Sequence, residues 1–167
     1  MRQLWEVADF IRGVRRQMRF GELSRAPLQI LRLEWRGNAV ECDWMVRPAD
    51  VWDAELRRPD RERNVSQQAL QDAMALRDLI FAELTGVECA SLRAFRPSAP
   101  REPLELIIAG TVLREEIVRT GIRSLAMKVK LCGLKFSLDN GVLRALQEQE
   151  CGIFKVVDDV HFNHMTL

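Results

Sequence analysis

The sequence predicts an α+β protein whose helices pack on one face of a mostly antiparallel sheet, in the order α-β-β-α-β-β-α-β. Three observations lead to this prediction. Apolar residues recur every three or four positions in three separate segments, which is typical of helices with one buried face. Apolar and charged residues alternate on both sides of Gly37-Asn38, as in a β-hairpin. Two further strand-like segments, separated by a proline-rich turn, follow the second helical segment.

The first predicted helix runs from Gln3 to Arg19. Its apolar stripe consists of Leu4, Val7, Ala8, Ile11, Val14 and Met18. The other side is strongly basic, and its candidate interaction surface consists of Arg12, Arg15, Arg16 and Arg19. Such a helix can lie on an anionic membrane or a partner, although basic residues more commonly form the solvated face of a folded domain.

The hairpin that follows has two half-buried strands. Leu31, Leu33 and Trp35 alternate with charged residues before the turn, and Val40, Cys42, Trp44 and Val46 do so after it. Gly37 and Asn38 tolerate positive φ, so we expect a tight turn there. Trp35 and Trp44 lie on the apolar rows, and we therefore expect both in the core.

A segment without periodicity, from Pro48 to Asn64, contains a mixed-charge run interrupted by Pro59. We interpret it as a charged linker between residues 1–63, which hold the first helix and the hairpin, and residues 64–167. At 167 residues, the two parts are expected to form one compact unit.

The second part is predicted from helix and turn signals. A helix should begin at Ser66, whose hydroxyl can cap free backbone amides, and end near Leu84 before Thr85-Gly86. The further predicted elements are strands at Val87 to Phe95 and Leu104 to Val112, a helix at Glu115 to Leu131, a strand at Leu134 to Leu138, a helical stretch at Val142 to Gln149 and a strand at Ile153 to Val157.

Two glycine-containing segments carry a family resemblance. Leu106 to Val112 contains Gly110 in an apolar-x-Gly-x-Val pattern, and Lys130 to Lys135 contains Gly133 at a helix exit. On these segments, residues 66–143 resemble the BON family. The chain departs from the family by a proline-rich loop, Pro97 to Pro103, in place of a tight turn. The resemblance implies binding to a partner or a membrane surface, often in the periplasm, and it transfers no functional residues.

Composition excludes several classes of protein. The 25 basic and 24 acidic residues nearly cancel, so no global cationic field draws the chain to nucleic acid, and we expect no nucleic-acid partner. No run of about 18 apolar residues is present, which argues against a transmembrane segment. The first 20 residues lack the apolar core of a secretory signal, which predicts a cytoplasmic protein.

Few residues offer recognisable chemistry. Cys42, Cys89, Cys132 and Cys151 stand singly and are interpreted as reduced thiols. The two histidines, His161 and His164, lie beside Asp158 and Asp159 and are the candidate metal ligands. Nucleophile elbows and phosphate-binding glycine loops are missing from the sequence, so we expect no cofactor.

The sequence thus favours a non-catalytic module that binds a protein or a small ligand, with a protein partner or self-association through a strand edge or the first helix. One alternative is an enzyme of unrecognised type, with a site formed only in three dimensions and Pro48 to Asn64 as a lid. A second alternative is a peripheral module at a membrane surface.

Overall fold

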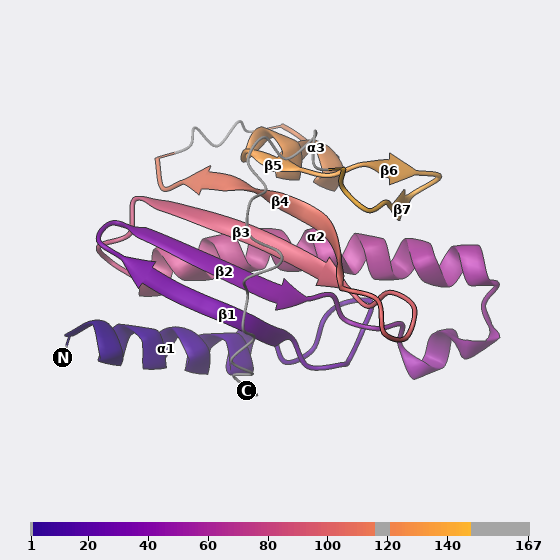
Figure 1. Ribbon diagram of the computed structural model, residues 1–167, viewed down its shortest axis with the longest axis horizontal. Coiled ribbons are helices and arrows are strands. Elements are labelled where there is room, and N and C mark those ends of the chain that lie inside the picture. Colours follow the sequence, from indigo (N-terminus) through magenta and orange to yellow (C-terminus); the bar gives the residue numbers. More distant parts are fainter. Residues whose placement is uncertain (1, 116–120, 148–167) are drawn as a thin grey trace.

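A computed structural model describes residues 2–115 and 121–147 and confirms the α+β class (Figure 1). The elements, in chain order, are helix α1 (Arg2–Gln17), strands β1 (Gln29–Arg36) and β2 (Ala39–Met45), the 3-10 helix η1 (Val51–Glu55), helix α2 (Arg58–Glu83), strands β3 (Cys89–Arg96) and β4 (Glu105–Leu113), helix α3 (Leu125–Leu131), and strands β5 (Leu134–Lys135), β6 (Leu138–Asp139) and β7 (Val142–Leu143). The predicted order α-β-β-α-β-β-α-β is therefore confirmed as far as β5.

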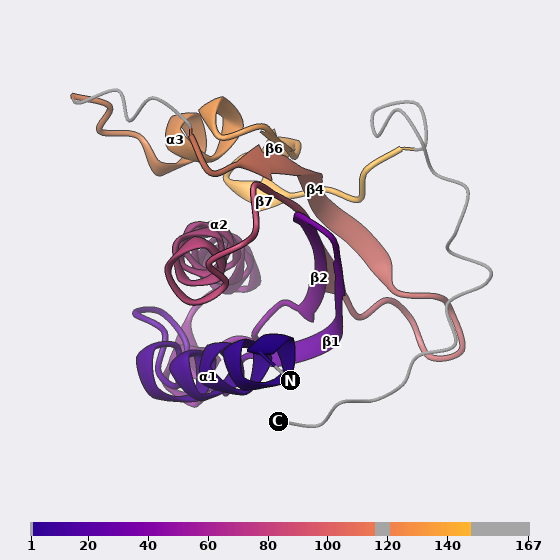
Figure 2. The same ribbon diagram turned by 90° about the vertical axis from the view of Figure 1, so that its left-hand side faces the viewer.

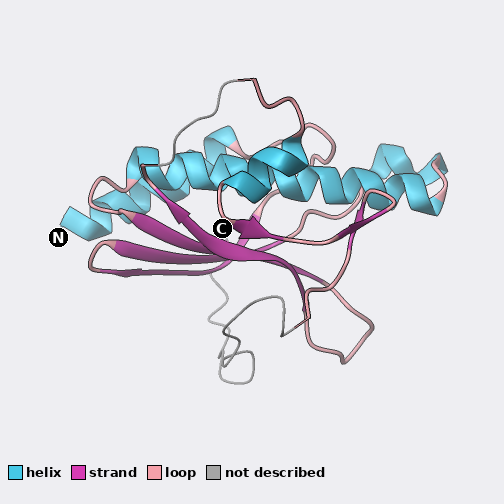
Figure 3. Cartoon of the chain, turned by 90° about the horizontal axis from the view of Figure 1, so that it is seen from above, coloured by secondary structure: helices cyan, strands magenta, loops and turns pink. Residues whose placement is uncertain are grey.

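The main sheet has the order β1-β2-β3-β4-β5, and β6 pairs with β7 in a separate small sheet. All neighbouring strands are antiparallel except β2 and β3, which are parallel. Figures 2 and 3 show that the three α-helices lie on the same side of the main sheet. The prediction of helices on one face of a mostly antiparallel sheet is therefore correct.

The predicted hairpin forms around Gly37, whose φ of +58° is the left-handed conformation that glycine adopts readily. Arg36 pairs with Ala39 across this two-residue turn. Trp44 is fully buried, and Trp35 is half-buried against the core, so both tryptophans occupy the predicted side of the sheet.

One hydrophobic core joins both predicted parts of the chain. Phe10, Val14 and Trp44 lie in the same cluster as Leu76, Leu92 and many other residues that follow Arg63. The predicted boundary at Arg63 falls inside α2, which packs against both α1 and α3. The charged linker was therefore predicted wrongly, because residues 58–63 form the first turns of α2.

The start of α2 has a simple physical reason. Pro59 occupies the first turn, where a backbone N–H has no partner within the helix and its loss removes no hydrogen bond. The proline that sequence reasoning took as a break is therefore compatible with the helix start.

Three further predictions need correction. In α1, Leu4 is 71% exposed, whereas Phe10, which lies outside the predicted stripe, is buried. Helix α3 begins only at Leu125, where the hydroxyl of Ser124 accepts a hydrogen bond from the Met127 N–H at 3.3 Å. The predicted helical stretch after Val142 is wrong, since Val142–Leu143 form β7. The strand predicted at residues 153–157 lies outside the described residues.

Gly110 and Gly133 lie next to each other where the end of α3 meets β4. Gly133 has a φ of +104° and follows the last turn of α3. A Cβ atom on Gly110 would lie 2.3 Å from the Gly133 carbonyl oxygen, so this close approach of β4 to the α3 exit requires glycine at position 110.

A buried polar network fixes the segment between α1 and β1 to α2. Arg47, 2% exposed, donates to both carboxylate oxygens of Asp72 at 2.9 and 3.2 Å. Arg47 also donates to the carbonyls of Met18 at 2.6 Å and Ala26 at 3.0 Å. Gln68 donates to Asp72 at 3.0 Å. Each nitrogen of the Arg47 guanidinium thus donates a hydrogen bond inside the fold. A buried charge is tolerated only when it is paired and hydrogen-bonded in this way.

Candidate functional site

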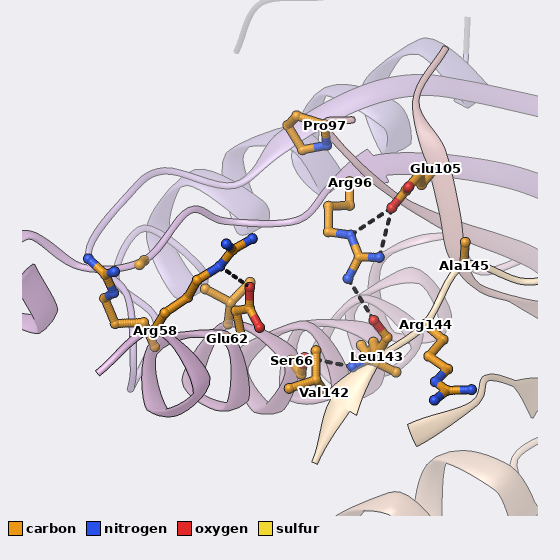
Figure 4. Close-up of a pocket in the computed structure, with 13 residues that line it drawn as sticks. Arg58, Glu62, Ser66, Arg96, Pro97, Glu105, Val142, Leu143, Arg144 and Ala145 are labelled. Atoms are coloured by element: carbon orange, nitrogen blue, oxygen red, sulfur yellow. Dashed lines mark hydrogen bonds and ion pairs between the residues drawn. The ribbon is translucent and has the colours of Figure 1, made fainter. Parts of the chain in front are cut away.

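An open cleft of about 750 Å³ lies between the first turns of α2, the turn region that joins β3 to β4, and β7 (Figure 4). We call it the arginine cleft. Its described lining residues are Ala49, Arg58, Arg61, Glu62, Val65, Ser66, Arg96, Pro97, Glu105, Val142, Leu143, Arg144 and Ala145.

One wall of the arginine cleft is a single face of α2. Its five residues, Arg58, Arg61, Glu62, Val65 and Ser66, follow the helical spacing of three and four that brings side chains to one side. Arg58 Nε donates to Glu62 Oε1 at 3.0 Å. Arg61 is half-buried, and its side chain forms no hydrogen bond or ion pair with another residue in the described ranges. The N–H donors of its guanidinium are therefore available to bind a ligand.

The opposite wall holds a second, ordered arginine. Arg96 donates through Nε and Nη2 to Glu105 Oε2, at 3.1 and 2.7 Å, and through Nη1 to the Leu143 carbonyl at 2.6 Å. The Leu143 N–H in turn donates to Ser66 Oγ at 2.9 Å. Strand β7 therefore connects β3 to α2 across the cleft, as Figure 4 shows.

The charge of this cleft is positive. Four arginines (58, 61, 96 and 144) line it together with two glutamates, and each glutamate already pairs with an arginine. Arg144 pairs with Asp139 outside the cleft lining. A planar guanidinium binds carboxylate and phosphate groups through two parallel hydrogen bonds. The arrangement therefore suits an anionic ligand.

The predicted basic surface is exposed, with Arg12, Arg15 and Arg16 on α1 and Arg19 just beyond its end, but the four arginines have different surroundings. Arg15 and Arg19 line a hollow of about 500 Å³ together with Pro27 and Leu28. Arg12 pairs with Asp9 one turn earlier, and Arg16 is exposed. The structure thus brings two of the four arginines to a common hollow.

The candidate metal ligands His161 and His164 lie outside the described residues. Within residues 2–115 and 121–147, no group of three or more His, Cys, Asp or Glu side chains is arranged to hold a metal ion. In the same ranges, no helix is both long and apolar enough to cross a membrane.

The described cysteines are free thiols. Cys42 is completely buried in the core, and this burial, together with the neighbouring Asp43 carboxylate, raises the pKa of its thiol far above the usual value. A thiol that stays protonated at neutral pH is a poor nucleophile, which agrees with its interpretation as a structural residue.

Comparisons with known proteins give no assignment: no protein-family model, curated protein or solved structure matches the chain. The resemblance of residues 66–143 to the BON family stays a prediction.

Sequence reasoning missed the arginine cleft for an identifiable reason. With the helix placed at Ser66, Arg58 and Arg61 belonged to a linker and had no common face. A helix begun at Arg58 would have shown the pattern Arg58, Arg61, Glu62, Val65. The approach of Arg96 and Arg144 to that face had no signal in the sequence.

Proposed function

We propose that this protein is a non-catalytic binding module and that the arginine cleft binds a ligand bearing carboxylate or phosphate groups. The observation that carries the proposal is Arg61, a half-buried arginine that faces the cleft without a described ion-pair partner. Arg58 and Arg96 flank it with guanidinium groups that are already oriented by Glu62 and Glu105.

The alternative of an enzyme has less support from the same cleft. Its two carboxylates are held in ion pairs with arginine, and the oxygen of Ser66 accepts a backbone hydrogen bond. General acid–base catalysis requires a group that can exchange a proton with a substrate. These contacts favour recognition of a charged ligand over chemistry on it.

The test is titration of the protein with inorganic phosphate, citrate and a short oligoglutamate peptide, followed by calorimetry at low and moderate salt. We expect at least one probe to bind, and the affinity to fall with added salt because the contacts are ionic. A charge-assisted hydrogen bond contributes about 1.5–3 kcal/mol, so Arg61→Ala should weaken binding by roughly tenfold or more.

A matched control separates the cleft from overall charge. The variants Arg58→Ala/Arg61→Ala and Arg12→Ala/Arg16→Ala both remove two exposed or half-buried arginines from a helix surface. Only the first pair should weaken binding substantially. Equal losses from both pairs, or no binding of any probe by the wild-type protein, would contradict the proposal.

Helix α1 supports a second candidate function, contact with an anionic membrane surface. Leu4 and Trp5 are 71% and 67% exposed, and by helical spacing Trp5 lies on the same outward side as Arg12 and Arg16. Exposed apolar side chains beside arginines are typical of helices that lie in the interface of a bilayer.

Vesicle co-sedimentation tests this second candidate. We expect binding to vesicles with phosphatidylserine but not to purely zwitterionic vesicles, and loss of binding for Trp5→Ser and for Arg12→Ala/Arg16→Ala. Binding that is unchanged in both variants, or absent from every vesicle, would exclude α1 as a membrane contact.

A further inference from the structure

Strand β1 forms one edge of the main sheet, and only β2 pairs with it among the described elements. The alternation of hydrogen bonds shows which of its backbone groups are free. The Asn38 carbonyl accepts from the Cys89 N–H of β3, so residues of β2 with odd numbers direct their backbone groups towards β1. Their partners in β1 are Arg32, Glu34 and Arg36. The N–H and C=O groups of Leu33 and Trp35 therefore point to the open edge.

The side chains of β1 alternate in the same regular way. Arg32, Glu34 and Arg36 lie on the sheet face away from the helices, and Leu33 and Trp35 pack against the core. A row of positive, negative and positive charges at an unpaired edge can match a second copy of itself, because opposite charges facing each other across antiparallel strands are stabilising and like charges are not.

Two-fold symmetry limits the pairings of β1 with itself. If Leu33 faces Leu33 of a second copy, Arg32 faces Glu34 in both directions and the free backbone groups meet. If Leu33 faces Trp35, Glu34 faces Glu34 and Arg32 faces Arg36, which places like charges together. If Trp35 faces Trp35, only the last three residues of the strand overlap. Of these three registers, only the one with Leu33 facing Leu33 combines opposite charges across the interface with pairing along most of the strand.

We propose that the protein forms a symmetric dimer by antiparallel pairing of β1 edges, with Leu33 opposite Leu33 of the second copy. The two five-stranded sheets then become one continuous sheet, a form of strand addition in which backbone hydrogen bonds give affinity and side-chain charges fix the register. The irregularity in β1, between Ile30 and Arg32, lies outside the central pairs. The proposal is independent of the arginine cleft, which is built from α2, β3, β4 and β7.

Sedimentation equilibrium over a wide concentration range tests the association. The wild-type protein should show a monomer–dimer equilibrium. Glu34→Arg places arginine opposite Arg32 twice per dimer, and we expect the dimer dissociation constant to rise about tenfold or more. The control is Glu41→Arg, which disturbs the same ion-pair cluster around Arg32 but lies on β2, away from the edge. It should leave the dissociation constant within about threefold.

A cysteine cross-link tests the register. In a background with serine at positions 89, 132 and 151, Leu33→Cys should form an intermolecular disulfide under mild oxidation, because directly opposed residues have Cα atoms about 5.5 Å apart. Trp35→Cys is the control, since residue 35 would face residue 31 and not itself. A wild-type protein that stays monomeric at all concentrations, or cross-linking of Trp35→Cys in place of Leu33→Cys, would overturn the proposal. The cross-link decides the question if Glu34→Arg fails to fold.

Discussion

Removing the buried partner of Arg47 should destabilise the fold strongly. Asp72→Leu removes the only carboxylate that pairs with Arg47 among the described residues. Because Arg47 is 2% exposed, water cannot take the place of that carboxylate. Breaking one side of a buried ion pair costs about 3–5 kcal/mol. Arg47→Met should cost at least as much, because it also removes the donor to the carbonyls of Met18 and Ala26.

The double variant Arg47→Met/Asp72→Leu separates charge from hydrogen bonding. It buries no unpaired charge, so we expect its destabilisation to be smaller than the sum of the single variants by about 3 kcal/mol or more. It should still be less stable than the wild type, since without Arg47 the buried Met18 carbonyl and the partly buried Ala26 carbonyl lose their donor, at about 1–3 kcal/mol each. The loss should therefore lie at roughly 2–6 kcal/mol.

Urea unfolding followed by tryptophan fluorescence measures these differences, because Trp44 is buried in the core. The shift in midpoint at constant m-value gives the change in unfolding free energy. Single-variant losses below about 1 kcal/mol, or strict additivity in the double variant, would refute the view that the network depends on a desolvated ion pair.

Three further predictions concern single sites. Gly110→Ala should cost about 1–3 kcal/mol in unfolding free energy, because the backbone of Gly133 and Leu134 occupies the space of the new methyl group. The control Gly86→Ala, whose new methyl group would have its nearest contact at 3.9 Å, should cost less than about 0.5 kcal/mol. Trp44→Phe should lower the unfolding free energy by less than about 1.5 kcal/mol in the same urea assay, because the buried Nε1 has no described hydrogen-bond partner. A loss as large as that of Trp44→Ala, about 3–5 kcal/mol, would contradict this and indicate that Nε1 does form a hydrogen bond. Contacts with Arg36 and then Arg32 lower the pKa of Glu34 below its usual 4.5. The wild type should therefore lose stability relative to Glu34→Gln as pH falls from 4.5 through the lowered pKa. A stability difference between the two proteins that does not change with pH would contradict this.

The parts of the fold that sequence predicted are those set by local pattern. The hairpin depends on alternation and on the conformational freedom of Gly37, both readable from neighbouring residues. The stop of α3 at Gly133 is similarly local. These elements required no knowledge of what lies across the core.

The errors arose where distant contacts decide the structure. Proline at position 59 was interpreted as a break because its tolerance at a helix start depends on where the helix begins. Val142 and Leu143 were predicted at the start of a helical stretch from the residues that follow them. In the structure they pair instead with Leu138 and Asp139 in a small sheet next to α2.

The candidate site was largely beyond sequence reasoning. Arg58 and Arg61 precede Arg96 by more than 30 residues, and Arg144 follows it by almost 50. Their convergence depends on the register of β3 against β4 and on the hydrogen bonds of Leu143 to both walls. No local pattern encodes such a meeting of segments.

The parallel pair at the centre of the sheet has a consequence for how the chain folds. Strands β1 and β2, and strands β3 and β4, are hairpins that can form early from nearby residues. Ala39 pairs with Cys89, about 50 residues later, so β2 and β3 can join only after α2 has closed a long loop between them. We therefore expect two hairpins to form first and the docking of α2 to limit the rate at which they merge into one sheet.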